Sequence, residues 1–204
     1  MLIKTDKEII LASTSPVRKQ ILEDVGIKFK TVSPTCDEDS LKKEYIQNAP
    51  NFSIRNLAIF LSCEKALSIS KQYPDSFIIG SDQVCEFEGG EISKSKDAQM
   101  AISQLSAFND KIHFQNNGVV VAKDGKIIFE NASKVELKMR KLTKLEIESY
   151  VNYDKPWGCA GSYKYESYGK HLFEKTEGDY YSILGMSIQP LLNFLHSEGV
   201  ISFS

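Results

Sequence analysis

The chain has 204 residues, a formal net charge of -2 at pH 7, 42% hydrophobic residues and 25% charged residues. These values are ordinary for a globular protein with a sizeable core. The near balance of charge excludes a general electrostatic attraction to nucleic acid, so any anion binding requires a local group of cations. No apolar run approaches the roughly 20 residues that a membrane span requires. We therefore expect neither nucleic acid nor a membrane among the partners of this chain.

The cysteines favour a reducing compartment. The chain has four, Cys36, Cys63, Cys85 and Cys159, and they form no C-x-x-C pair. Scattered cysteines of this kind are typical of reduced, mostly buried thiols, which predicts a cytoplasmic protein. The polar residues 1–7 show no signal-peptide pattern.

The first informative stretch predicts a strand, a hydroxyl-rich turn and a helix. The apolar run Ile9–Ala12 is typical of a buried strand, and Ser15 can cap a helix that has Pro16 in its first turn. Hydroxyls, free backbone N–H groups and the cations of Arg18 and Lys19 then gather at a helix N-terminus. Such a place can bind an anion. The alternative is a turn in which Ser and Pro only cap the helix and the cations only face solvent.

The other elements follow from periodicity and from turn residues. In the first half we expect a helix ending at Gly26, a strand over 27–32, a polar loop or short helix over 33–48, a long helix opened by Pro50 and Asn51 and ended by Pro74, and a buried strand over 77–79. In the second half we expect a tight turn over 88–91, a helix over 96–108 capped by Ser95, a hairpin turning at Asp124 and Gly125, a strand over 135–140, a helix from Thr143 to near Tyr153, a short strand over 172–174 and a last helix over 188–197 capped by Ser187.

A carboxylate next to the buried strand over 77–79 is the second candidate feature. Gly80 and Ser81 are small, which allows something to approach the backbone closely. We expect Asp82 and Gln83 to lie at the carboxyl end of this strand, where open α/β sheets bind ligands. A carboxylate in such a place is costly unless it is paired or bound to metal. The alternative role for Asp82 is turn formation or capping.

These features together suit the chemistry of a phosphate chain with a divalent metal. The sequence offers a cationic turn near Arg18, the carboxylates of Glu38 and Asp82, and the cations of Lys65 and Lys94. A metal bridges carboxylate and phosphate oxygens while cations neutralise the remaining charge. The Walker, H-E-x-x-H and G-x-S-x-G patterns are all absent. The three histidines are isolated, which favours structural roles for them.

Residues 11–22, which read Leu-Ala-Ser-Thr-Ser-Pro-x-Arg-x-x-Ile-Leu, closely resemble the opening motif of the Maf family of nucleoside triphosphate pyrophosphatases. The resemblance continues through Gly80–Val84 and Cys159–Lys164 and covers almost the whole chain. It implies a mixed α/β (α+β) fold: an elongated, twisted mixed sheet flanked by helices around a central cleft, similar to inosine triphosphatases. It implies one Maf-like domain over residues 1–204, with two lobes around the cleft as an open alternative.

The resemblance also implies a reaction, namely cleavage of the α–β phosphate bond to give a nucleoside monophosphate and pyrophosphate. The sequences Ser-Asp-Gln-Val and Cys-Ala-Gly-Ser-Tyr-Lys look like the branch acting on 7-methyl-GTP. A pyrophosphatase for dTTP, UTP or another non-standard nucleotide stays open. So does a weakly catalytic nucleotide-binding regulator of septum formation. The implied partners are a nucleoside triphosphate, a divalent cation (Mg, Mn or Co) and, as an open candidate, a second copy in a homodimer.

Carried over to this chain, the family resemblance implies roles for ten residues. Asp82 matches the proton acceptor and metal partner, Glu38 an acidic position that shares the metal, and Lys65 and Lys94 catalytic phosphate-facing cations. On the substrate side, Ser13, Arg18 and Lys19 match residues near the phosphates, and Val17, Gln83 and Glu166 match positions linked to base choice.

Three of these positions carry particular chemistry. A carboxylate at Glu166 suits a methylated, cationic guanine, because it can accept hydrogens from N1 and N2. Val17 stands where Trp or Arg is usual, which removes a stacking surface or a charge. Lys19 replaces a usual Arg and lacks its bidentate fork.

Overall fold

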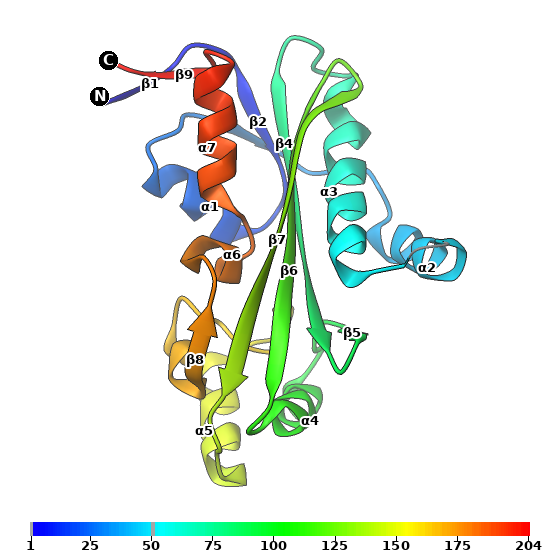
Figure 1. Ribbon diagram of the computed structural model, residues 1–204, viewed down its shortest axis with the longest axis vertical. Coiled ribbons are helices and arrows are strands. Elements are labelled where there is room, and N and C mark those ends of the chain that lie inside the picture. Colours follow the sequence, from blue (N-terminus) through cyan, green and yellow to red (C-terminus); the bar gives the residue numbers. More distant parts are fainter. Residues whose placement is uncertain (1, 50–51) are drawn as a thin grey trace. The chain divides into compact units, whose positions relative to one another are not determined.

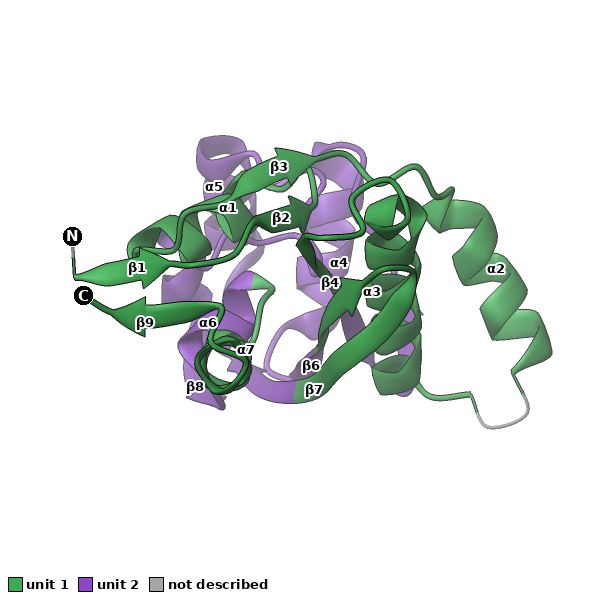
Figure 2. Cartoon of the chain, turned by 90° about the horizontal axis from the view of Figure 1, so that it is seen from above, with its two compact units in different colours: residues 1–83, 117–133, 185–204 green, residues 84–116, 134–184 purple. Residues whose placement is uncertain are grey.

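The computed structural model describes residues 2–49 and 52–204 and contains both helices and a mixed sheet (Figure 1). Its contacts divide the chain into two compact units (Figure 2). Unit 1 comprises residues 1–83, 117–133 and 185–204, and unit 2 comprises residues 84–116 and 134–184. The predicted mixed α/β class is confirmed. The single domain and its central cleft stay predictions.

The elements are, up to residue 123, β1 (Ile3–Thr5), β2 (Ile9–Ala12), α1 (Pro16–Asp24), β3 (Lys30–Val32), α2 (Glu38–Asn48), α3 (Ile54–Ser70), β4 (Phe77–Phe87), β5 (Gly90–Ile92), α4 (Ala98–Phe108) and β6 (Ile112–Lys123). The remainder comprises β7 (Lys126–Met139), α5 (Lys144–Asp154), the 3₁₀ helix η1 (Tyr168–Leu172), β8 (Phe173–Glu177), α6 (Tyr180–Leu184), α7 (Ile188–Ser197) and β9 (Ile201–Phe203).

The main sheet has the strand order β3-β2-β4-β6-β7-β8, with β5 paired to β4. β2 is parallel to both of its neighbours, β3 and β4, whereas β5 and β8 pair antiparallel to β4 and β7. All four residues of β2 are buried, as its continuous apolar sequence predicts for an interior parallel strand. Within the described residues, β1 and β9 form a separate antiparallel pair.

Two glycines let helix α3 lie unusually close to the sheet in unit 1 (Figure 1). A Cβ atom added at Gly80 of β4 would lie 2.2 Å from the carbonyl oxygen of Ser62, and one added at Gly118 of β6 would lie 2.5 Å from that of Ala58. Neither strand could carry a side chain at these points without moving the helix. The sequence predicted a close approach at Gly80, and the approaching group is α3.

The strand that carries Asp82 is longer than predicted. β4 runs from Phe77 to Phe87, so Asp82 and Gln83 lie within the strand and not at its carboxyl end. The apolar run ends after Ile79, but the polar residues remain in the strand, and its far end forms a hairpin with β5. Backbone pairing of this kind does not depend on an apolar side-chain pattern.

Other element boundaries also differ from the predictions. Asp97, not Ser95, caps α4, because its side chain accepts a hydrogen bond from the backbone N–H of Met100 at 2.8 Å. Ser53 caps α3, and the predicted opening residues Pro50 and Asn51 lie outside the described residues. Ser187 is the N-cap residue of α7, but its side chain makes no capping hydrogen bond.

Several elements had no clear signal in the sequence. They are β1, β9, α6 and η1, all of which have five residues or fewer. The polar stretch over 33–48 contains the helix α2, which was one of the two predicted alternatives. The turn at Asp124 and Gly125 and the capping box of Thr143 and Glu146 are both confirmed.

Unit 2 has its own core, which surrounds a buried histidine. His113 is fully buried, stacks on Phe108 at 4.5 Å between ring centroids, and lies with Nε2 3.0 Å from the hydroxyl of Tyr163. Burial lowers the pKa of His113 to about 3. This histidine therefore packs as a neutral core residue, in agreement with the predicted structural role.

Two further predictions from composition can be compared with the structure. All four cysteines are free, although only Cys85 is fully buried. In the described part of the chain, every helix is too short or too polar to cross a membrane.

Candidate active site

The serine-rich turn after β2 is organised by its own side chains. The backbone N–H of Ser15 donates to Oγ of Ser13 at 3.1 Å, and that of Arg18 donates to Oγ of Ser15 at 3.4 Å. The predicted cap at Ser15 is thus confirmed. Because Leu11 pairs with Ile79 in the parallel ladder, this turn begins beside the middle of β4.

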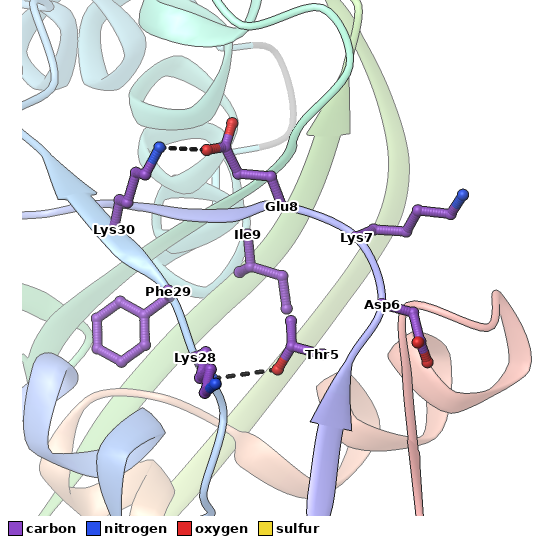
Figure 3. Close-up of a pocket in the computed structure, with 8 residues that line it drawn as sticks. All are labelled: Thr5, Asp6, Lys7, Glu8, Ile9, Lys28, Phe29 and Lys30. Atoms are coloured by element: carbon purple, nitrogen blue, oxygen red, sulfur yellow. Dashed lines mark hydrogen bonds and ion pairs between the residues drawn. The ribbon is translucent and has the colours of Figure 1, made fainter.

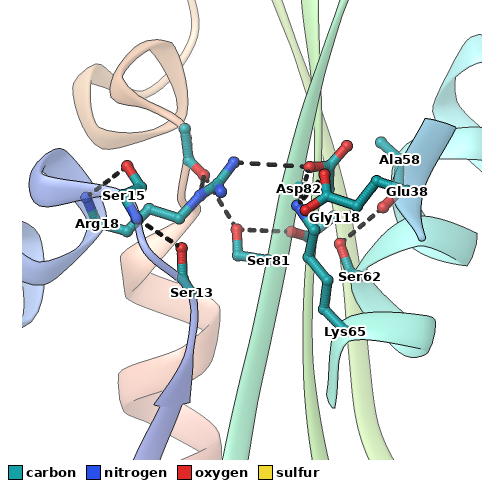
Figure 4. Close-up of polar contacts among 11 residues, drawn as sticks. Ser13, Ser15, Arg18, Glu38, Ala58, Ser62, Lys65, Ser81, Asp82 and Gly118 are labelled. Carbon is teal, nitrogen blue, oxygen red and sulfur yellow. Dashed lines mark hydrogen bonds and ion pairs between the residues drawn. The ribbon is translucent and has the colours of Figure 1, made fainter. Parts of the chain in front are cut away.

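Four side chains from four elements meet in unit 1, and we call them the charge cluster: Arg18, Glu38, Lys65 and Asp82 (Figure 4). Nζ of Lys65 lies 2.5 Å from Oδ1 of Asp82 and 2.9 Å from Oε2 of Glu38. Nη2 of Arg18 lies 4.0 Å from the same Oδ1 atom of Asp82. The structure therefore brings together two of the predicted cations and both predicted carboxylates.

The charge cluster is largely withdrawn from solvent. Lys65 is 4% exposed and Asp82 is 6% exposed, whereas the side chain of Glu38 is 43% exposed. Burial lowers the pKa of Arg18, and the carboxylates of Asp82 and Glu38 oppose this effect. Buried charges are tolerated only when they are paired, and an ion pair of this kind adds little net stability. Such a grouping is more typical of a functional site than of a stabilising one.

The guanidinium of Arg18 has a second contact, which the sequence did not predict. Its Nε donates to the carbonyl oxygen of Gly185 at 3.0 Å. Oγ of Ser81 lies 3.0 Å from that carbonyl and 2.9 Å from the carbonyl of Gly118 (Figure 4). Every residue has a backbone carbonyl, so residue types in the sequence do not reveal which carbonyls accept these bonds. The available signals were the glycines themselves, at positions 118 and 185.

The other predicted substrate residues of unit 1 lie around this cluster in different ways. Gln83 is near Gly185, because a Cβ added at Gly185 would lie 3.5 Å from its Oε1 atom. Val17 is partly buried on α1. Lys19 is not part of the charge cluster: it is exposed and pairs with Glu23 at 3.6 Å along α1.

Lys94 and Glu166 belong to unit 2 and are exposed there. Both act on the same thiol: burial raises the pKa of Cys159, the charge of Glu166 raises it further, and the charge of Lys94 lowers it. The backbone also links the two segments, since the N–H of Gly158 donates to the carbonyl of Ser95 at 3.0 Å. Within unit 2, these two predicted residues therefore share one neighbourhood.

The carboxylates of the charge cluster are suitable ligands for a divalent metal only together with further oxygens. Among the residues that the structure describes, no three His, Cys, Asp or Glu side chains are arranged to hold a metal ion. Mg²⁺, however, is commonly bound by one or two carboxylates plus substrate phosphates. Asp82 and Glu38 supply such a pair, and both now contact Nζ of Lys65. The residues present thus fit a metal that arrives with a phosphate chain.

A surface pocket of about 410 Å³ lies elsewhere in unit 1 (Figure 3). It is lined by Lys7, Lys28 and Lys30 at the amino ends of β2 and β3, whereas the charge cluster lies beyond their carboxyl ends. Lys30 is already paired with Glu8. This pocket contains none of the predicted site residues, and its charged lining residues (Asp6, Lys7, Glu8, Lys28 and Lys30) are all exposed.

Comparison with known proteins places the chain in a family. A family model described as Maf-like protein matches residues 8–198. A relative from Nitrobacter hamburgensis is 35% identical over 198 residues, covering 96% of each chain, and one from Legionella pneumophila (strain Paris) is 33% identical over 195 residues with the same coverage. Both relatives are named nucleoside triphosphate pyrophosphatase.

Solved structures give a weaker likeness. The Staphylococcus aureus Ham1 protein matches with a TM-score of 0.48 and 14% identity, over 94% of this chain and 100% of that one. A dITP/XTP pyrophosphatase from Mycobacterium abscessus matches with a TM-score of 0.39 and 15% identity, over 66% and 75%. Likenesses this weak support no argument about this chain. The family model and the curated relatives, by contrast, match nearly the whole chain, which therefore belongs to the Maf-like protein family.

Proposed function

We propose that the chain is a nucleoside triphosphate pyrophosphatase that hydrolyses the α–β phosphate bond of 7-methyl-GTP. The observation that supports this most is the charge cluster, in which the cations of Arg18 and Lys65 contact the carboxylate of Asp82 beside a serine-rich turn. Membership of the Maf-like family and the names of the curated relatives support the same reaction.

In this proposal the charged side chains bind the phosphates, accept the proton of the attacking water and hold the metal. Arg18 binds phosphate oxygens with its planar donors, and Lys65 binds them as a point charge. Lys65 has three donor hydrogens, so it can contact a phosphate oxygen while it keeps a bond to Asp82. Asp82 accepts a proton from the attacking water as the water oxygen bonds to the α-phosphorus, and the bond from that phosphorus to the bridging oxygen breaks to release pyrophosphate.

Asp82 and Glu38 would hold the divalent cation, Mg, Mn or Co. When bound, that ion supplies neutralisation of the charge that develops on the phosphate oxygens. Lys94 is proposed as a further phosphate-facing cation, and Ser13 and Lys19 as residues near the phosphates. These roles rest on the family resemblance.

Base choice is proposed to depend on Val17, Gln83 and Glu166. The methylated guanine carries a positive charge, and a carboxylate at Glu166 can offset it while accepting hydrogens from N1 and N2. A neutral residue at this position would lack the first of these effects. This reasoning favours 7-methyl-GTP over dTTP and UTP as the substrate.

A panel of nucleoside triphosphates tests the proposal. The purified protein is supplied with 7-methyl-GTP, GTP, dTTP or UTP and with Mg²⁺, Mn²⁺ or Co²⁺, and both pyrophosphate and monophosphate are measured. We expect the highest kcat/KM for 7-methyl-GTP. Preferred turnover of dTTP or UTP would replace the substrate. Nucleotide binding by a folded protein with no turnover of any triphosphate would overturn the enzyme assignment and favour a regulator of septum formation.

A further inference from the structure

We infer that Ser81 and the backbone carbonyl of Gly185 are positioning groups that hold the guanidinium of Arg18 in the orientation needed to meet a phosphate. The identity of the ligand rests on the proposed function. The contacts all lie within unit 1.

Two contacts restrict the orientation of the Arg18 guanidinium, one at Nε and one at Nη2. Its Nε donates to the carbonyl of Gly185 at 3.0 Å, and its Nη2 lies 4.0 Å from Oδ1 of Asp82. A guanidinium is planar and has five donor hydrogens in fixed directions. The bond from Nε to the carbonyl leaves rotation about its own axis open, and the ion pair of Nη2 with Asp82 restricts that rotation. An arginine that is oriented before its ligand arrives loses less rotamer freedom on binding.

Ser81 donates a hydrogen bond to the Gly185 carbonyl, which in turn accepts one from Arg18. This serine is fully buried in β4, and its hydroxyl lies 3.0 Å from the carbonyl of Gly185 and 2.9 Å from that of Gly118. The hydroxyl shares its single hydrogen between these two acceptors. In this way it links the backbone of β6 to the segment that precedes α7. Without it, the Gly185 carbonyl would lose the hydrogen bond that links it to β4, while its bond from Arg18 comes from a long side chain that itself needs an anchor.

The backbone at Gly185 has a positive φ angle, and this conformation agrees with the positioning role of its carbonyl. Its φ angle is +112°, a value that residues with a side chain rarely adopt. A Cβ atom there would lie 3.7 Å from both Nε and Nη2 of Arg18. The glycine therefore permits the backbone conformation that directs its carbonyl at Arg18, whereas 3.7 Å is an ordinary contact distance and would not by itself displace the guanidinium.

A purely structural role for Ser81 makes a different prediction from a positioning role. If Ser81 only satisfies two buried carbonyls, then its removal should weaken ligand binding equally with or without Arg18. If it acts through Arg18, the effect should disappear when Arg18 is absent. A double-mutant cycle separates the two cases, because residues that act together give non-additive effects.

The experiment measures Kd for pyrophosphate by calorimetry in the wild type, Ser81→Ala, Arg18→Ala and the double variant. We expect Ser81→Ala to raise Kd about tenfold, an effect within the range of coupled neighbours, and to cause no further change in the Arg18→Ala background. An equal increase in both backgrounds overturns the inference, and so does no increase in either. Ser70→Ala is the matched control: Ser70 is also a fully buried serine of unit 1, and its hydroxyl accepts from the backbone N–H of Gly125. It should leave Kd unchanged.

Two additions keep the result interpretable. If Ser81→Ala does not fold, Ser81→Cys keeps the size of the side chain with a weaker donor and should give a smaller increase in Kd that again depends on Arg18. Because the readout is binding, it is separate from turnover. A wild type that binds pyrophosphate but hydrolyses no triphosphate overturns the proposed function and leaves the cycle valid. A wild type that binds no pyrophosphate overturns both.

Discussion

Nζ of Lys65 lies 2.5 Å from Oδ1 of Asp82, and both side chains are almost fully buried. The same ammonium group contacts Glu38 at 2.9 Å. One lysine thus serves two carboxylates, of which one is buried and the other is partly exposed. Changes at the two carboxylates should therefore have different consequences for folding and for activity.

The first prediction concerns the buried carboxylate. Asp82→Asn should lower kcat by roughly 10²- to 10⁴-fold, the range typical for loss of a general base. It should also lower the free energy of unfolding by about 1.5–3 kcal/mol, because Lys65 loses its charge-assisted hydrogen bond to a buried carboxylate but keeps its contact with Glu38. Steady-state kinetics and urea unfolding measure the two effects. Glu38→Gln is the control for folding. It should lower the free energy of unfolding by clearly less than Asp82→Asn does, since Glu38 is partly exposed. A variant Asp82→Asn with near wild-type kcat would remove Asp82 from the mechanism.

The second prediction concerns the contact between α3 and the sheet. Gly80→Ala would place a Cβ atom 2.2 Å from the backbone carbonyl of Ser62, so α3 and its residue Lys65 must shift. We expect a loss of about 3 kcal/mol in the free energy of unfolding, together with reduced turnover. The matched control is Gly90→Ala, where the nearest atom to the new Cβ would be 3.6 Å away. Equal melting temperatures for the two variants would contradict the argument.

The third prediction is a pH dependence of stability. The folded chain keeps His113 neutral down to a pKa of about 3, whereas the unfolded chain takes up a proton near the ordinary value of 6.5. The unfolded state therefore binds more protons between these values, and stability falls as the pH drops below 6.5. The expected loss is about 2–3 kcal/mol at pH 4.5 relative to pH 7.

Urea unfolding across this pH range measures the effect. In His113→Gln, the loss of unfolding free energy between pH 7 and pH 4.5 should be smaller than in the wild type by about 2–3 kcal/mol. The control His196→Gln, at an exposed histidine, should leave the slope as it is in the wild type. A wild-type slope that persists in His113→Gln would show that other groups cause it.

The fourth prediction concerns base choice. Glu166→Gln removes the charge that would offset a cationic guanine, so the ratio of kcat/KM for 7-methyl-GTP to that for UTP should fall by about tenfold or more. Glu166 is exposed, and therefore the melting temperature should hardly change. Kinetics with both substrates measure the ratio. The specificity argument fails if the ratio is unchanged.

The parts of the fold that sequence predicts well are those that depend on local chemistry. The run Ile9–Ala12, the cap at Ser15 and the capping box at Thr143 were each predicted at the correct residues. Each involves an apolar run or a side chain within a few positions of its partner. The length of β4 was wrong, because its polar half is held by pairing with other strands, which leaves no pattern in its own residues.

The charge cluster was only partly predictable for a similar reason. Charged side chains such as Lys65 and Asp82 are visible in the sequence, and the family motif singled them out. Their approach depends on the glycine at position 80, whose closeness to α3 no spacing rule reveals. The carbonyl of Gly185 is a backbone group separated by 167 positions from Arg18, so no local pattern in the sequence pairs the two.

The two faces of β4 contact different parts of the site. Gly80 and Asp82 face α3, whereas Ser81 and Gln83 lie near Gly185. Successive side chains of a strand alternate between faces, so inserting or deleting one residue upstream within β4 would exchange the two sets. Such a change would turn Ser81 toward α3 and remove the glycine gap at the same time. We therefore expect length variation among functional relatives to be confined to the loops that flank this strand, while the spacing from position 80 to position 83 stays fixed.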